Sequence, residues 1–210
     1  MDALDELAAP AADLLGRVDA LLARYGAPAD HPMWTLTRRV RALPGEAVGA
    51  ITELRPGPLA AAGTRLRELL RGYDDTTVPA APTWRGAGAE RFGYRWAALC
   101  AHSEGLVGRL EATAGYLDSV ADWLTAARLA VARTVAIALV SAEAAAVRTV
   151  PADAALSAAD LAAHVLTAVA RVYDDGRTLL ADWPARLAEL PFRAEILDAP
   201  TRPEVTEVVP

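Results

Sequence analysis

The chain has 210 residues, of which 53% are hydrophobic and 23% charged, a composition that excludes wholesale disorder and supplies enough apolar side chains for a sizeable core. Apart from histidine, its basic side chains are all arginine, which fits a gene under strong GC bias, as in actinobacteria. The net charge is −6. Because this balance leaves no basic face for phosphates, no nucleic-acid partner is expected.

The apolar pattern predicts an all-α protein, because β-branched residues form no alternating runs of the kind that strands require. Residues 2–25 place leucine, valine and alanine at three- and four-residue spacing with acids between them, as in an amphipathic helix. Residues 26–32 contain two prolines and a glycine, and we expect a loop there. Short helices are predicted at 33–43 and 46–54, separated by Pro44-Gly45.

Residues 59–75 and 87–148 are predicted to form the two arms of a long helical hairpin. The second arm repeats apolar residues in alternating steps of four and three, which is typical of a helix that packs along most of its length. We expect this stripe to contact the core or a partner through Trp96, Leu99, Leu106, Leu110, Leu117 and Leu124. Such an arm would reach roughly 90 Å at 1.5 Å per residue. Either this arm kinks, most readily at Gly105 or Gly108, or other helices flank it.

A last helix is predicted after Pro151, opened by a capping box at Ser157-Ala158-Ala159-Asp160 and kinked at Pro184. The residues from Asp198 onward are rich in proline and acids and have no apolar period, which is typical of a flexible tail. We therefore expect one elongated antiparallel helical bundle. Its predicted parts are a punctuated helical segment (1–57), the helical hairpin (58–150), a C-terminal helix packing on the bundle (151–197) and the tail (198–210).

Residues with catalytic or ligand chemistry are few and scattered. His31, His102 and His164 lie in different segments, without a second histidine or a cysteine at metal-binding spacing. We expect His31 to be exposed and Cys100 to be a small core residue, and the arginines at 38, 39 and 41 to form a solvated helix face. The sequence predicts a non-enzymatic protein with no metal and no cofactor. A deep polar pocket inside the bundle would instead favour an enzyme.

We expect neither a membrane span nor a classical secretory signal. The first residues, Met-Asp-Ala-Leu-Asp-Glu-Leu, are acidic where a signal peptide is basic. The candidate apolar run, residues 134–142, is bracketed by Arg133 and Glu143 and falls far short of the ~20 apolar residues that a spanning helix needs.

A Trp-x-Gly sequence lies between the two predicted arms. Trp84 and Gly86 are followed by Ala89 and Phe92 at the start of the second arm. A Trp-x-Gly turn between two amphipathic helices resembles the WxG family of helical-hairpin proteins exported by type VII (ESX) secretion systems, and the similarity covers about residues 58–148. The resemblance implies a hairpin clasp that lies near one element of a bipartite export signal. It also implies secretion without a classical signal peptide, and a protein partner or homo-oligomer formed through amphipathic helices.

The chain departs from this family in two respects. None of its tyrosines has aspartate or glutamate four residues later, so the Tyr-x-x-x-Asp/Glu half of the family's export signal is missing from this chain. It is also about twice as long as the single-hairpin members. The resemblance therefore implies a larger, divergent member that borrows the second half of the signal from a partner chain. The alternative is a cytoplasmic helical adaptor or self-associating scaffold that is not exported.

Overall fold

The computed structural model describes residues 1–74, 85–149 and 154–191, and every regular element in these residues is an α-helix. The prediction of an all-α protein is confirmed for this part of the chain. The helices are α1 (Ala3–Tyr25), α2 (Met33–Val40), α3 (Pro44–Glu53), α4 (Gly57–Asp74), α5 (Ala87–Leu139), α6 (Ala142–Thr149) and α7 (Ala154–Glu189).

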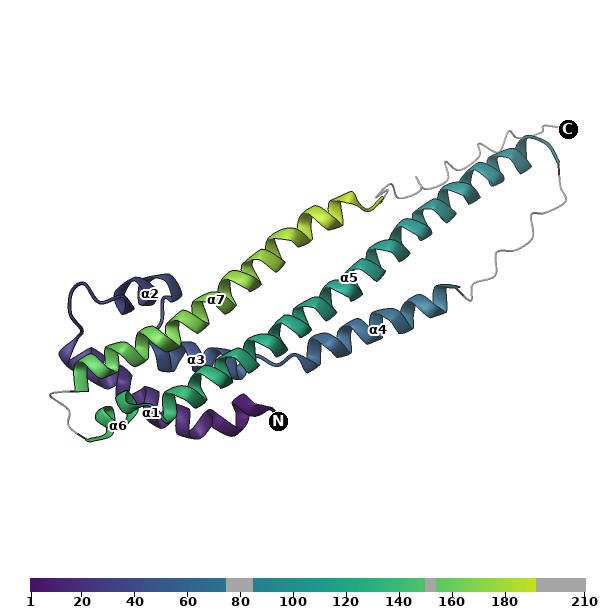
Figure 1. The fold of residues 1–210 in the computed structure, drawn as a ribbon. Helices are drawn as coiled ribbons and strands as arrows, with labels where there is room; N and C mark the ends of the chain where they lie inside the picture. Colours follow the sequence, from purple (N-terminus) through teal and green to yellow (C-terminus); the bar gives the residue numbers. More distant parts are fainter. Residues whose placement is uncertain (75–84, 150–153, 192–210) are drawn as a thin grey trace, which may run out of the picture.

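The molecule has a broad end and a narrow end (Figure 1). At the broad end, which we call the head, α1, α2, α3 and α6 pack around the last turns of α5 and the first turns of α7. The narrow end, the stalk, consists of α4, the rest of α5 and the rest of α7. In the stalk α4 runs antiparallel to α5, and both α4 and α7 have extensive contacts with α5. α5 is therefore the helix that both other helices of the stalk pack against.

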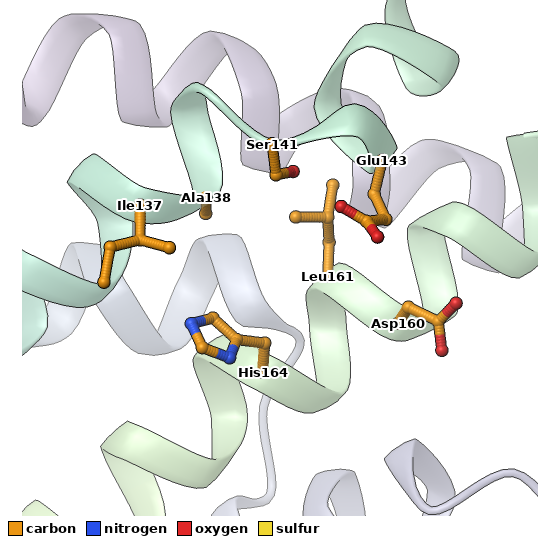
Figure 2. A pocket seen from close by; sticks show the side chains of 7 residues that line it. All are labelled: Ile137, Ala138, Ser141, Glu143, Asp160, Leu161 and His164. Carbon is orange, nitrogen blue, oxygen red and sulfur yellow. The ribbon is translucent and has the colours of Figure 1, made fainter.

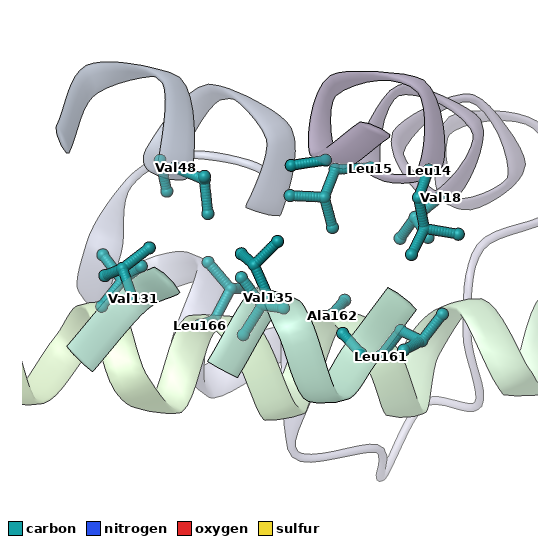
Figure 3. Close-up of a cluster of buried hydrophobic side chains, with 14 of the residues drawn as sticks. Leu14, Leu15, Val18, Val48, Val131, Val135, Leu161, Ala162 and Leu166 are labelled. Carbon is teal, nitrogen blue, oxygen red and sulfur yellow. The ribbon is translucent and has the colours of Figure 1, made fainter. Parts of the chain in front are cut away.

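The main hydrophobic core lies in the head (Figure 3). Leucine and valine side chains of α1 and α3 face valines of α5 and the apolar side of α7 across this core. They include Leu14, Leu15, Val18, Val48, Val131, Val135, Leu161 and Leu166. The core includes α5 residues only from Ala127 onward. Interior packing therefore fixes the head more firmly than the stalk.

Small side chains let α7 approach its neighbours closely. Ala154, Ala158, Ala159 and Ala162 of α7 are all 0% exposed, and this end of α7 contacts α1, α2 and α6. Alanine also has the highest helix propensity and loses no side-chain entropy on folding. The alanines therefore allow close packing of helices around the first turns of α7, beside the leucine and valine side chains of the core.

The side chain of Arg128 crosses the head from α5. It is 1% exposed, and its guanidinium donates to Asp2 and Asp5 in the capping box that begins α1 and to backbone carbonyls at the end of α3. The hydrogen bond from Arg128 lowers the pKa of Asp2, and Arg55 and Arg128 both lower the pKa of Asp5. One buried cation thus joins three helices.

The long second arm of the hairpin ends earlier than predicted. α5 continues through Gly105 and Gly108 without a kink, and α4 and α7 flank it, which is the other of the two expected arrangements. The helix ends at Leu139 instead, and α6 continues at an angle of 61° to it. The change of direction buries Ala144 and Val147 of α6 in the core. Packing of the head therefore determines where the helix breaks, although no glycine or proline is present there.

Two other expected boundaries differ in the structure. Pro44-Gly45 does not separate two helices, because Pro44 is the first residue of α3, where its fixed φ is favourable and its missing N–H is not needed. Ser157 does not open the last helix, since α7 already includes Ala154. Pro184 lies inside α7, which extends to Glu189.

Aromatic side chains attach α7 to α5 in the stalk. Tyr116 of α5 stacks on Trp183 of α7, with ring centroids 4.4 Å apart. Trp123 of α5 lies against the backbone of Gly176. On the other side of α5, Leu117 lies next to Gly63 of α4 and Arg67 forms an ion pair with Asp118. The stalk is thus held by a few specific contacts rather than by a continuous core.

By length and composition alone, α7 is apolar enough to cross a membrane, and α5 with α6 meets the same criterion only as a bent pair. In α7, however, 50% of the apolar window is buried inside the protein. A core helix has the same character, so the finding is weak evidence for a span.

Asp19 provides a test of the head's electrostatics. Burial raises the pKa of this carboxyl to about 6, although the N–H of Gly45 donates to it. The folded-state pKa lies above the ordinary value of 3.8, so protonation of Asp19 stabilises the fold fully below pH 3.8, and this stabilisation is lost as the pH rises through about 6. We expect the free energy of unfolding of Asp19→Asn, relative to the wild type, to increase between pH 4 and 7 and then level off.

Urea unfolding at intervals from pH 4 to 8 measures this difference directly. Asp13→Asn, on the exposed side of the same helix, controls for the loss of a carboxylate from α1. A difference between Asp19→Asn and wild type that stays constant over the whole range would mean that Asp19 titrates alike in the folded and unfolded chains.

Candidate functional site

The turn that carries the Trp-x-Gly sequence is described only in part. Trp84 lies outside the described residues. Gly86 is the N-cap of α5 and has φ 103°, a value that side chains other than glycine rarely adopt. Ala89 is half-buried, and Phe92, 41% exposed, stacks on Trp96 with ring centroids 6.0 Å apart. The first turns of α5 therefore bring together an aromatic pair directly after the glycine.

The predicted stripe on α5 divides into a covered and an exposed part. Leu124 is buried, and Leu106, Leu110 and Leu117 are half-buried in the stalk. Trp96 is half-buried and Leu99 is 42% exposed. Between the start of α5 and Ala114, Gly105 is the only residue described by the structure that is buried. The heptad pattern thus continues beyond the region where this chain covers it.

The exposed part lies where α5 extends past its neighbours. Figure 1 shows the N-terminal end of α5 projecting beyond the ends of α4 and α7. The end of α7 is level with Arg109, whose guanidinium donates to the carbonyl of Leu187 at 3.4 Å. We call residues 87–104 of α5 the tip. Tyr94, which is 80% exposed, also lies on it.

Chemically, the tip offers apolar and aromatic contact rather than reactive groups. Trp and Phe side chains bury large areas when a second surface covers them. Arg91 and Arg95 flank the aromatic pair and are exposed. Cys100 is half-buried within the tip rather than a core residue. An aromatic centre with an arginine rim is typical of a protein–protein contact.

A second feature is a hollow in the head of about 190 Å³ (Figure 2). It lies between the end of α5, the start of α6 and one face of α7. Its lining is formed by Ile137, Ala138, Ser141, Glu143, Asp160, Leu161 and His164. Sequence reasoning missed it, because the residues come from three separate helices.

The polar groups of this hollow are arranged for structure rather than for nucleophilic chemistry. The Ser141 hydroxyl accepts the N–H of Ala144 and so caps α6. The N–H of Glu143 itself and the Ser141 hydroxyl hold the pKa of the Glu143 carboxyl below its usual range, and His164 adds electrostatic attraction. Among the described residues, no group of three or more His, Cys, Asp and Glu side chains could hold a metal ion.

His31 was expected to be exposed, and this was wrong. Its side chain is 9% exposed, because the loop after α1 folds back onto α7. The N–H of Met33 donates to Nδ1, which leaves the proton on Nε2 to be donated to Asp160 at 3.1 Å. Of the other histidines, His164 is exposed and His102 is half-buried. The arginine cluster is largely solvated, although Arg39 pairs with Asp174 of α7.

No protein-family model matches this chain, and no curated protein or solved structure is detectably similar to it.

Proposed function

We propose that the protein acts by helix-mediated association with a partner chain through the tip of α5, as a large and divergent WxG-type substrate of type VII secretion. The observation that supports the association is the apolar stripe of α5, which continues past the part that α4 and α7 cover. Leu99 is 42% exposed, although it occupies a position in the same heptad series as Leu124, which is 5% exposed. A partner helix laid along the tip would continue the packing that α4 and α7 provide lower in the stalk.

The energetics favour such an association. Covering a large apolar side chain contributes about 1.5–3 kcal/mol, and aromatic side chains are over-represented among the residues that dominate binding. Trp96 and Leu99 lie one helical turn apart on one face, so a single apposed helix can contact both. The arrangement of α4 antiparallel to α5, joined across the segment that contains Trp84, supports the helical-hairpin part of the proposal.

Export can be tested with the native protein in its own organism. We expect the protein in culture supernatant of the parent strain and its absence from the supernatant of a strain lacking the type VII ATPase, with a cytoplasmic marker as lysis control. Trp84→Ala should reduce export while helicity, measured by circular dichroism, is retained. Retention of the protein inside cells of both strains would instead favour a cytoplasmic adaptor or scaffold.

A matched pair of variants tests the tip separately from the turn. Leu99→Glu places a charge on the tip, whereas Leu69→Glu places one on α4, where Leu69 is 61% exposed. We expect Leu99→Glu to reduce export and recovery of the partner, and Leu69→Glu to behave as the wild type. Equal export of all three proteins would remove the tip from the proposal.

A further inference from the structure

The last turns of α5, at the opposite end from the tip, carry an exposed face with almost no charge. We call this the α5 outer face, and it consists of Ala126, Leu129, Ala130, Arg133, Ala136, Ile137 and Val140. At 3.6 residues per turn these positions fall within about a third of the helix circumference. Leu129, Ile137 and Val140 are 43%, 60% and 86% exposed. Contiguous apolar surface of this kind typically marks an interaction site.

This face carries one positive charge, and carboxylates lie beside one end of it. Its single charged residue, Arg133, forms no ion pair with any described residue. Directly beyond its far end is the hollow of about 190 Å³, whose lining includes the carboxylates of Glu143 and Asp160 and the imidazole of His164 (Figure 2). Asp160 is also bonded to His31, and Arg148 donates to the carbonyl of Leu139 beside this face. By size the hollow could hold several water molecules, which is also room for a guanidinium group. One surface thus offers an unpaired cation and, within two helical turns, an acidic recess.

We propose that the α5 outer face is the interface of a homodimer, in which Arg133 of each copy enters the acidic hollow of the other. A twofold axis between Ala136 and Ile137 makes the two α5 helices antiparallel. Positions equally far from the axis then face each other, so Arg133 lies opposite Val140 of the second copy, next to the hollow. Such an isologous interface satisfies both charge pairs at once.

A second copy fits this face better than a membrane does. The alanines at 130 and 136 allow two helix backbones to approach closely, and Ile137 fills the groove beside the partner's Ala136. Arginine and carboxylate can form paired hydrogen bonds when they are removed from water. The chain's net charge of −6 disfavours anionic membranes. The interface lies in the head, so it goes beyond the proposed function of the tip and either can fail without the other.

Sedimentation equilibrium of the 210-residue chain tests the dimer. We expect a species of twice the chain mass of 22.1 kDa at micromolar concentration. Ile137→Glu should raise the dimer dissociation constant by at least ~30-fold, as expected for a residue central to an interface. Leu180→Glu is the matched control, because Leu180 on α7 has the same exposure of 60%. Arg133→Glu should also dissociate the dimer, and adding Glu143→Arg should restore it.

Cysteine cross-linking tests the position of the axis. In a Cys100→Ser background, Ala136→Cys should give a disulfide-linked dimer with oxidised glutathione, because the two substituted positions lie next to the axis, on either side of it, close enough for a disulfide to span them. Ala126→Cys, on the same face but far from the axis, should not.

Three outcomes would overturn the proposal. One is a chain that sediments as a monomer at every concentration. Another is a dimer that resists Ile137→Glu and dissociates with Leu99→Glu, which would place the second copy at the tip. The third is a monomer that co-sediments with phosphatidylcholine vesicles through Ile137, which would assign the face to lipid.

Discussion

Replacing Arg128 with methionine should lower the free energy of unfolding by about 3–5 kcal/mol, the range expected when one partner of a buried charge pair is removed. The guanidinium is 1% exposed and donates to the carbonyls of Ile51, Thr52 and Leu54 at 3.0, 2.7 and 3.0 Å. Methionine keeps most of the apolar stem but removes these hydrogen bonds and those from Arg128 to Asp2 and Asp5. Urea unfolding followed by circular dichroism measures the loss.

Arg17→Met is the matched control. Arg17 forms an ion pair with Asp13 on the surface of α1, where both side chains are more than half exposed, and surface pairs contribute only about 0–1 kcal/mol. A loss of less than about 1 kcal/mol for both variants would mean that Arg128 is no more important than a surface arginine.

The effect of Arg128 also has a pH signature. Its hydrogen bonds hold the pKa of Asp2 well below the ordinary value of 3.8. Stabilisation of this kind is present in full above the unfolded-state pKa and is lost as the pH falls through the lower folded-state value. We therefore expect acid to destabilise the wild type more than Arg128→Met, so that the two stabilities converge at low pH.

Local patterns were sufficient to predict the helices, because apolar periodicity and the prolines and glycines between helices are properties of neighbouring residues. α1 and α4 begin and end within two residues of their predicted limits. The end of α5 was not predictable in this way. It depends on burial of Ala144 and Val147 against helices that are distant in sequence.

The heptad series showed that one face of α5 is apolar but not which helix covers it. Only the structure shows that α4 and α7 both end before the tip, and hence that Leu99 and Leu124 have different surroundings. Arg128 was missed for a related reason. An arginine between apolar residues is ordinarily a solvated position, and its partners Asp2 and Asp5 are 126 and 123 residues away in the sequence.

Gly176→Ala should destabilise the protein by about 1–3 kcal/mol, as is typical of overpacking, although alanine is the better helix former. Gly176 is in the interior of α7, and a Cβ atom built on it would lie 2.4 Å from Cζ2 of Trp123. The indole ring is rigid and half-buried, so it cannot move aside without separating α7 from α5. Gly115→Ala is the control, because a Cβ there has no atom within 4 Å. We expect it to stabilise the fold by about 0.5–1 kcal/mol.

Opposite signs for two identical substitutions would show that the contact between Trp123 and Gly176 holds α7 against α5. A double variant makes the test specific. Trp123→Leu removes the ring, so Gly176→Ala should cost less in that background than in the wild type, and the difference is the coupling free energy of the pair. Additive effects of the two substitutions would mean that the methyl group is accommodated elsewhere and that the stalk does not depend on this contact. Coupling would identify Gly176 as the position that sets how closely α7 can approach α5.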